Sequence, residues 1–123
     1  MASRTRSARP TFGAGIRTAV RRTDRRFLQD VGRNLRAWTT NGTFPEALAF
    51  VSGYDAARAS SWLPGFRRWL GESLGRPDGT IAELVLASAS IQGEWPLTHA
   101  DDARATAALF ARLDEYLEGR EPG

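Results

Sequence analysis

The residues best suited to acid–base chemistry lie near position 100 of the chain. His99 is the only histidine, and Asp101 and Asp102 follow it closely. An imidazole titrates near neutral pH and can exchange protons, and a neighbouring carboxylate can orient it. Carboxylates at this spacing also begin helices, because they stabilise the positive end of the helix dipole. We therefore favour a capping role for Asp101 and Asp102, and keep a small enzyme that uses His99 as a third hypothesis.

The chain offers no other set of catalytic or metal-binding side chains. It has no cysteine, which excludes disulfides, thiolate zinc sites and cysteine nucleophiles. A single histidine cannot form a two-histidine zinc site. Ser52 precedes Gly53, but its neighbours lack the Gly-x-Ser-x-Gly elbow of the α/β-hydrolases. We expect no catalytic residue, no cofactor and no metal.

Tyr54 and Asp55 are the remaining polar candidates, and they directly follow Gly53. A glycine inside a helix costs roughly 1 kcal/mol relative to alanine. Gly53 therefore predicts a close approach by another helix or by a ligand. In the simpler interpretation, Tyr54 finds a hydrogen-bond partner at a helix–helix contact.

Positive charge is concentrated at the start of the chain. All 17 basic residues are arginine, a bias that we attribute to a GC-rich, bacterial genome. Residues 1–22 hold six arginines and no acid, a net charge of +6, whereas residues 23–123 hold 11 arginines and 14 acids, a net charge of −3. Such an arm could neutralise phosphates with little sequence preference. The candidate nucleic-acid contacts are Arg4, Arg6, Arg9, Arg17, Arg21, Arg22, Arg25 and Arg26.

The chain is rich in tryptophan, with four in 123 residues. Trp38 and Trp69 fall at apolar helix positions and are expected in the core. Trp62 and Trp95 lie at helix or loop boundaries and are expected to be partly exposed. Tryptophan and arginine are common hot spots of protein interfaces. The candidate partner-binding residues are therefore Trp62, Arg67, Arg68 and Trp95.

Apolar residues at helical spacing predict the elements that must position these side chains. The predicted helices span about residues 24–38, 44–59, 63–74, 81–90 and 99–119. Thr43 and Glu46 have the spacing of a capping box, as do Thr80 and Glu83. Gly75 is the expected end of the third helix. The predicted inward face of the last helix consists of Ala103, Ala107, Phe110, Leu113 and Leu117.

These elements predict an all-α fold, a compact bundle of four to five short helices with a flexible basic N-terminal arm. The arm covers residues 1–22 and is expected to be partly helical from Phe12. A single domain follows at residues 23–119, and residues 120–123 form a tail.

One segment of the chain resembles a group of known sequences. Residues 50–57 read Phe-x-x-Gly-Tyr-Asp-x-Ala, and residues 65–70 read Gly-Phe-x-x-Trp-Leu. With these two motifs, residues 44–75 resemble small actinobacterial helical proteins. The resemblance implies a helical fold and assigns no activity.

The sequence predicts a non-enzymatic accessory or regulatory subunit that binds another protein, or copies of itself, through an aromatic and arginine-bearing helical surface. The alternative is a nucleic-acid-associated protein that binds the phosphate backbone through its arm. No apolar stretch is long enough to span a membrane, and no secretory signal is recognisable at the start. We therefore expect no membrane partner and a cytoplasmic location.

Overall fold

The computed structural model describes residues 24–58, 62–92 and 95–120, and over these ranges the chain is all-α, without strands. Residues 24–33 are helical and lead into a short 3₁₀ helix, η2 (Leu35–Ala37). Four further helices follow: α3 (Phe44–Arg58), α4 (Leu63–Leu74), α5 (Ile81–Ser88) and α6 (His99–Arg120). The predicted arm, with Arg4 to Arg22, lies outside the described residues. The all-α prediction is confirmed.

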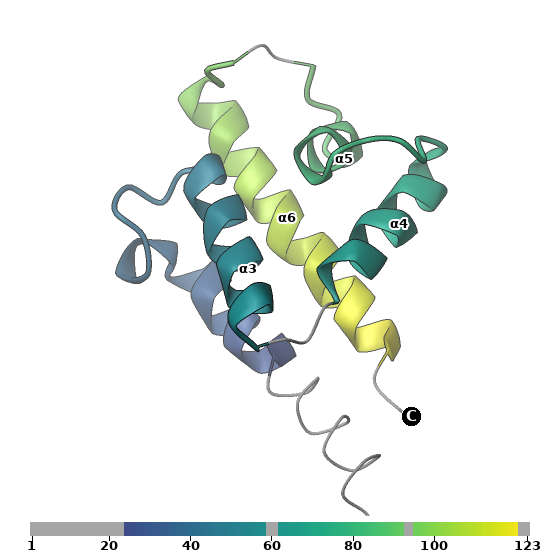
Figure 1. The fold of residues 1–123 in the computed structure, drawn as a ribbon. Coiled ribbons are helices and arrows are strands. Elements are labelled where there is room, and N and C mark those ends of the chain that lie inside the picture. Colours follow the sequence, from purple (N-terminus) through teal and green to yellow (C-terminus); the bar gives the residue numbers. More distant parts are fainter. Residues whose placement is uncertain (1–23, 59–61, 93–94, 121–123) are drawn as a thin grey trace, which may run out of the picture.

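The long helix α6 occupies the middle of the fold. It contacts α3 on one side and α4 and α5 on the other (Figure 1). The helix at 24–33 joins the same assembly through Arg25, which forms an ion pair with Asp114 of α6. Apolar side chains from every helix therefore meet around α6, and the buried set includes Leu28, Val31, Phe44, Val51, Phe66, Leu70, Leu84, Val85, Leu109, Leu113 and Leu117.

Local capping fixes where α3 and α5 begin, as the sequence predicts. The Thr43 and Thr80 hydroxyls accept hydrogen bonds from the Glu46 and Glu83 amides at 3.3 and 3.1 Å. The two glutamates accept in return from the threonine amides at 3.1 and 2.9 Å. At the other end of α4, Gly75 takes the left-handed conformation with φ of 69° and ends the helix.

The first described helix ends earlier than predicted, and this changes the position of Trp38. Asn34 leaves the helical region with φ of −141° and ψ of 55°, and the chain tightens into η2. Asparagine favours such exits because its side chain competes for backbone hydrogen bonds. Trp38 then lies past the helix with 46% of its surface exposed, so the prediction of a core position is wrong. Trp69 is half-buried.

The inward face of α6 is rotated relative to the prediction. Leu113 and Leu117 are buried as expected, but Ala103 and Ala107 are exposed and Phe110 is half-buried. The larger side chains of Leu109 and Tyr116 turn inward instead, and they bury more apolar surface than the two alanines would. The helix also continues through Gly119, its predicted end, to Arg120.

Gly53 does not mark the helix–helix contact that the sequence predicts. Among the described residues, a Cβ atom at Gly53 would meet no atom within 4 Å. Close approaches occur at other glycines instead, and at Gly71 a Cβ atom would be 2.9 Å from the carbonyl oxygen of Arg76. Glycine at position 71 therefore allows the turn after α4 to fold back onto that helix.

Candidate functional site

Four aromatic side chains form a cluster where the helix at 24–33 meets α3. The ring centroids of Phe27 and Tyr54 are 4.8 Å apart, and those of Phe27 and Trp38 are 5.1 Å apart in an edge-to-face arrangement. Phe50 completes the cluster, with its ring 5.9 Å from that of Trp38. Three of the rings are half-buried and Trp38 is exposed. We call this set of Phe27, Trp38, Phe50 and Tyr54 the aromatic surface.

The surface is built from two elements and one turn. Phe50 and Tyr54 lie four positions apart on α3, so they point to the same side of that helix. Phe27 comes from the preceding helix, and Trp38 is brought in by the turn after η2. Because each ring contacts at least two others of the set, the aromatic surface is held in place before any partner arrives.

A buried carboxylate anchors one end of the aromatic surface. The Tyr54 hydroxyl donates a hydrogen bond of 2.7 Å to Oδ1 of Asp24, whose side chain is fully buried. Nε of Arg58 lies 3.2 Å from the same oxygen, and its guanidinium is 5.7 Å from the Tyr54 ring centroid. Within the described ranges, the second Asp24 oxygen has no hydrogen-bond partner. The interpretation of Tyr54 as a tyrosine with a partner at a helix–helix contact is thus confirmed.

Because of this environment, the stability of the folded protein is expected to fall at alkaline pH. Burial and the hydrogen bond to Asp24 raise the pKa of Tyr54 from 10.0 to about 12. A group whose pKa is raised on folding contributes to the free energy of unfolding. This contribution is complete below the pKa of the unfolded state, and it is lost as the pH rises through the pKa of the folded state. We expect the wild-type protein to lose this contribution between pH 10 and about 12. Tyr54→Phe has no such ionisation and should lose stability less steeply there.

Urea unfolding of both proteins below pH 10 and across this window measures the difference. The wild-type protein is the reference for the Tyr54→Phe variant. The other tyrosine and all arginines are the same in both proteins, so a difference between them reports the ionisation of Tyr54. Parallel loss of stability in the two proteins would contradict the raised pKa of Tyr54.

Asp55 and Trp62 are structural in this fold. The buried Asp55 carboxylate accepts a 3.0 Å hydrogen bond from the backbone N–H of Trp62, which links the end of α3 to the start of α4. Trp62 is only 8% exposed, although the sequence predicts a partly exposed position. Its ring therefore presents little surface to a partner.

The other predicted partner-binding residues are not brought together into one surface. Arg67 donates to the carbonyl oxygens of Pro77 and Gly79 at 3.1 and 3.4 Å, and so holds the turn after α4. Arg68 is exposed on α4. Trp95 is 54% exposed and stacks on Phe44 with a centroid distance of 6.1 Å, apart from the aromatic surface.

The His99 cluster does not form a catalytic pair. Both carboxylate oxygens of Asp102 accept the backbone N–H of Phe44 at 3.1 Å, so this residue of α6 caps α3. Asp101 forms an ion pair with Arg104 at 3.2 Å. His99 is exposed, and no hydrogen bond joins it to either aspartate in the part of the chain that the structure describes. A general base would therefore lack an orienting carboxylate.

Of the predicted nucleic-acid contacts, the structure describes Arg25 and Arg26. Nε and Nη2 of Arg25 donate to the two Asp114 oxygens at 2.8 and 3.2 Å. This pair lowers the pKa of Asp114, and Gln29 adds a further hydrogen bond of 2.8 Å. Arg25 thus attaches the first helix to α6, whereas Arg26 is exposed.

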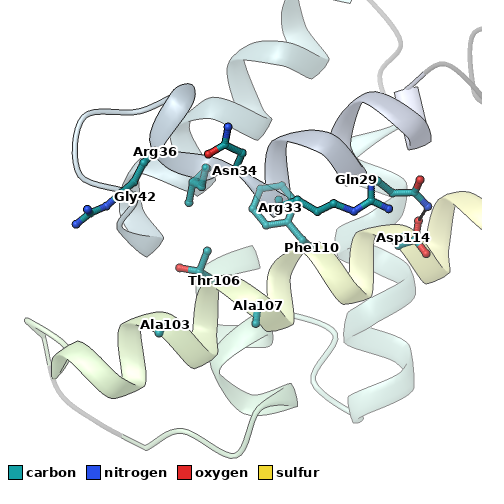
Figure 2. A pocket seen from close by; sticks show the side chains of 12 residues that line it. Gln29, Arg33, Asn34, Arg36, Gly42, Ala103, Thr106, Ala107, Phe110 and Asp114 are labelled. Carbon is teal, nitrogen blue, oxygen red and sulfur yellow. Dashed lines mark hydrogen bonds between the residues drawn. The ribbon is translucent and has the colours of Figure 1, made fainter.

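A groove lies between the helix at 24–33, the turn that follows it, and α6 (Figure 2). Its volume is about 690 Å³, and its walls include Arg33, Arg36, Ala107 and Phe110. The sequence did not indicate this groove, because Ala107 was assigned to the core face. The aromatic surface was missed for a similar reason, since it depends on how two helices face each other.

Comparison with known proteins adds no relative. No family model matches the chain, and no curated protein or solved structure gives a significant match. Over the described ranges, no group of three or more potential ligands could hold a metal ion. Among the helices that the structure describes, none has both the length and the apolar character needed to cross a membrane.

Proposed function

We propose that this protein is a non-enzymatic accessory or regulatory subunit that binds another protein through the aromatic surface. The observation that carries the proposal is the exposed ring of Trp38, fixed by contacts with Phe27 and Phe50. An ordered tryptophan at the surface offers a large contact area at little entropic cost on binding. Tryptophan, tyrosine and arginine are also the residues that most often dominate interface energies.

The chemistry of the surface suits a protein partner. Its centre is apolar and aromatic, and Arg58, which pairs with the buried Asp24, lies beside Tyr54. A partner that covers Trp38 and the neighbouring rings with apolar side chains would suit this surface. A cytoplasmic location is part of the proposal. The aromatic surface could also bind a second copy of the chain, and the test must distinguish this from a different partner protein.

Trp38→Ala tests the proposed function by affinity purification of the tagged protein from its own cells. We expect a partner that co-purifies with the wild-type protein to be retained at least about tenfold less by the variant, the loss typical of a hot spot. Trp95→Ala removes an exposed tryptophan of similar exposure elsewhere and should retain the partner. Equal retention by the Trp38→Ala variant would contradict the proposal. Size-exclusion chromatography reports whether the partner is a second copy.

Nucleic-acid binding remains the second candidate because of the net charge of +6 over residues 1–22. Binding of this kind weakens steeply with salt, since it releases counterions from the phosphates. A nuclease step in the same purification separates the two candidates. Release of the bound material by nuclease, unaffected by Trp38→Ala, would favour the arm over the aromatic surface.

A further inference from the structure

The floor of the groove is made of small and apolar residues. A Cβ atom at Gly32 would lie 2.9 Å from Cγ of Phe110, so the first helix sits directly on α6 at this point. Ala103 and Ala107 lie one helical turn apart, and both are exposed. Because their side chains are small, this part of the α6 surface does not fill the groove. The volume of about 690 Å³ falls within the range of ligand-binding clefts. The floor can therefore receive a few side chains of a partner.

Arg33 and Arg36 both line the groove, and their side chains extend in opposite directions, Arg33 towards Gln29 and Arg36 beside Gly42 (Figure 2). Arg33 is 73% exposed, and its ion pair with Asp30 at 3.2 Å is exposed too, so it contributes little and is readily exchanged. Among the described residues, Arg36 has no ion-pair or hydrogen-bond partner for its guanidinium. Its stem lies over Gly42, where a Cβ atom would be 3.0 Å from Cγ of Arg36. Gly42 has φ of 69°, so a glycine there both fits the turn and makes room for Arg36.

The acidic residues near the groove offset these charges only in part. Asp114 lines the groove and is bound by Arg25 and Gln29, and the charge of Arg33 also helps to lower the pKa of Asp114. A second, smaller hollow continues from Arg36 and Gly42 towards His99 and Asp102. The Asp102 carboxylate is turned to the backbone of Phe44. Among the described residues, Arg36 therefore faces an incoming ligand without an acidic partner, and Arg33 can exchange its exposed pair with Asp30 for a carboxylate of the ligand.

We propose that this groove binds an acidic peptide segment of the protein partner, with carboxylates on Arg33 and Arg36 and small or apolar side chains on the floor. The inference rests on the proposed function, because it names a chemistry for that partner. Guanidinium groups bind carboxylates through paired hydrogen bonds, which gives direction as well as charge. A peptide fits better than a nucleic acid, since Phe110 is half-buried and the rest of the floor offers no ring on which a base could stack.

Selection of a random peptide library on the full-length protein, at physiological ionic strength, tests the inference. We expect the selected peptides to be enriched in aspartate and glutamate. A synthetic copy of the best peptide should bind the Arg33→Ser, Arg36→Ser double variant about tenfold more weakly or worse. The control is the Arg68→Ser, Arg76→Ser double variant, which loses the same charge from exposed positions on α4 and its turn. Both variants keep the basic arm, so their difference reports the groove alone.

Three results would overturn the inference. The first is a selection without acidic enrichment, and the second is equal binding of the peptide by both double variants. The third is a single-stranded DNA that displaces the peptide and is weakened by the same two groove substitutions, which would make the groove a nucleic-acid site. We expect the Trp38→Ala variant to bind the peptide with unchanged affinity. The peptide experiment therefore tests the proposal for the groove, and the affinity purification tests the proposal for the aromatic surface, independently of each other.

Discussion

Replacement of Phe66 by alanine is expected to lower the free energy of unfolding by about 3–5 kcal/mol. The Phe66 side chain is fully buried, and its ring lies 5.7 Å from that of Tyr116 and 6.1 Å from that of Trp69. It therefore packs α4 against the central helix, and its removal leaves a cavity between them. A small domain is stable by only about 5–15 kcal/mol, so the loss is a large share of the total.

Urea unfolding followed by tryptophan fluorescence measures this loss. Arg68→Ala is the matched control, because Arg68 is exposed on the same helix and its substitution should change stability by no more than about 0.5 kcal/mol. A loss below roughly 1 kcal/mol for Phe66→Ala would mean that α4 does not pack on α6 through this ring.

Gly71→Ala is expected to lower the free energy of unfolding by about 1–3 kcal/mol, although alanine is the better helix former. The new methyl group would lie 2.9 Å from the Arg76 carbonyl oxygen and 3.5 Å from Cα of Pro77. Both are backbone atoms of a turn that Arg67 holds by hydrogen bonds, so the turn cannot move aside freely. Thermal and urea unfolding would both report the change.

Gly53→Ala provides the control of the same chemical change. A Cβ atom there meets nothing within 4 Å, and the residue is exposed in the middle of α3. Alanine should raise stability by up to about 1 kcal/mol, because it reduces the freedom of the unfolded chain and favours the helix. Opposite signs at the two glycines are expected, and a loss at both positions would contradict the free space around Gly53.

The features that the sequence predicted correctly depend on neighbours in the chain. The capping boxes that begin α3 and α5 join residues three positions apart, and Gly75 ends α4 through its own backbone angles. Such interactions act within one turn of a helix, so the local order of residues specifies them. The starts of α3, α4, α5 and α6 followed from these signals and from apolar spacing, whereas the ends of the first helix and of α6 differ from the prediction.

The features that the sequence missed depend on how helices face one another. Trp38 was assigned to the core because the helical period was extended past Asn34, where the chain changes conformation. Ala107 was assigned to the inner face of α6, yet Leu109 and Tyr116 take that face. The aromatic surface needs rings from two helices and a turn, so periodicity within one helix could not reveal it. The sequence pointed instead to Trp62, Arg67, Arg68 and Trp95, so the aromatic surface was not among its predicted partner sites.

The first described helix and α3 are both held by residues of α6, the last described helix in the chain. The backbone N–H of Phe44 is bound by Asp102, and Arg25 is bound by Asp114, a residue 89 positions later in the chain. Both helices that carry the aromatic surface are thus tied to α6, which is made last among the described helices. A chain that has not yet reached α6 lacks both ties, although its four rings are already present. If the proposed function holds, the partner is expected to bind the complete chain more tightly than a nascent chain that lacks α6.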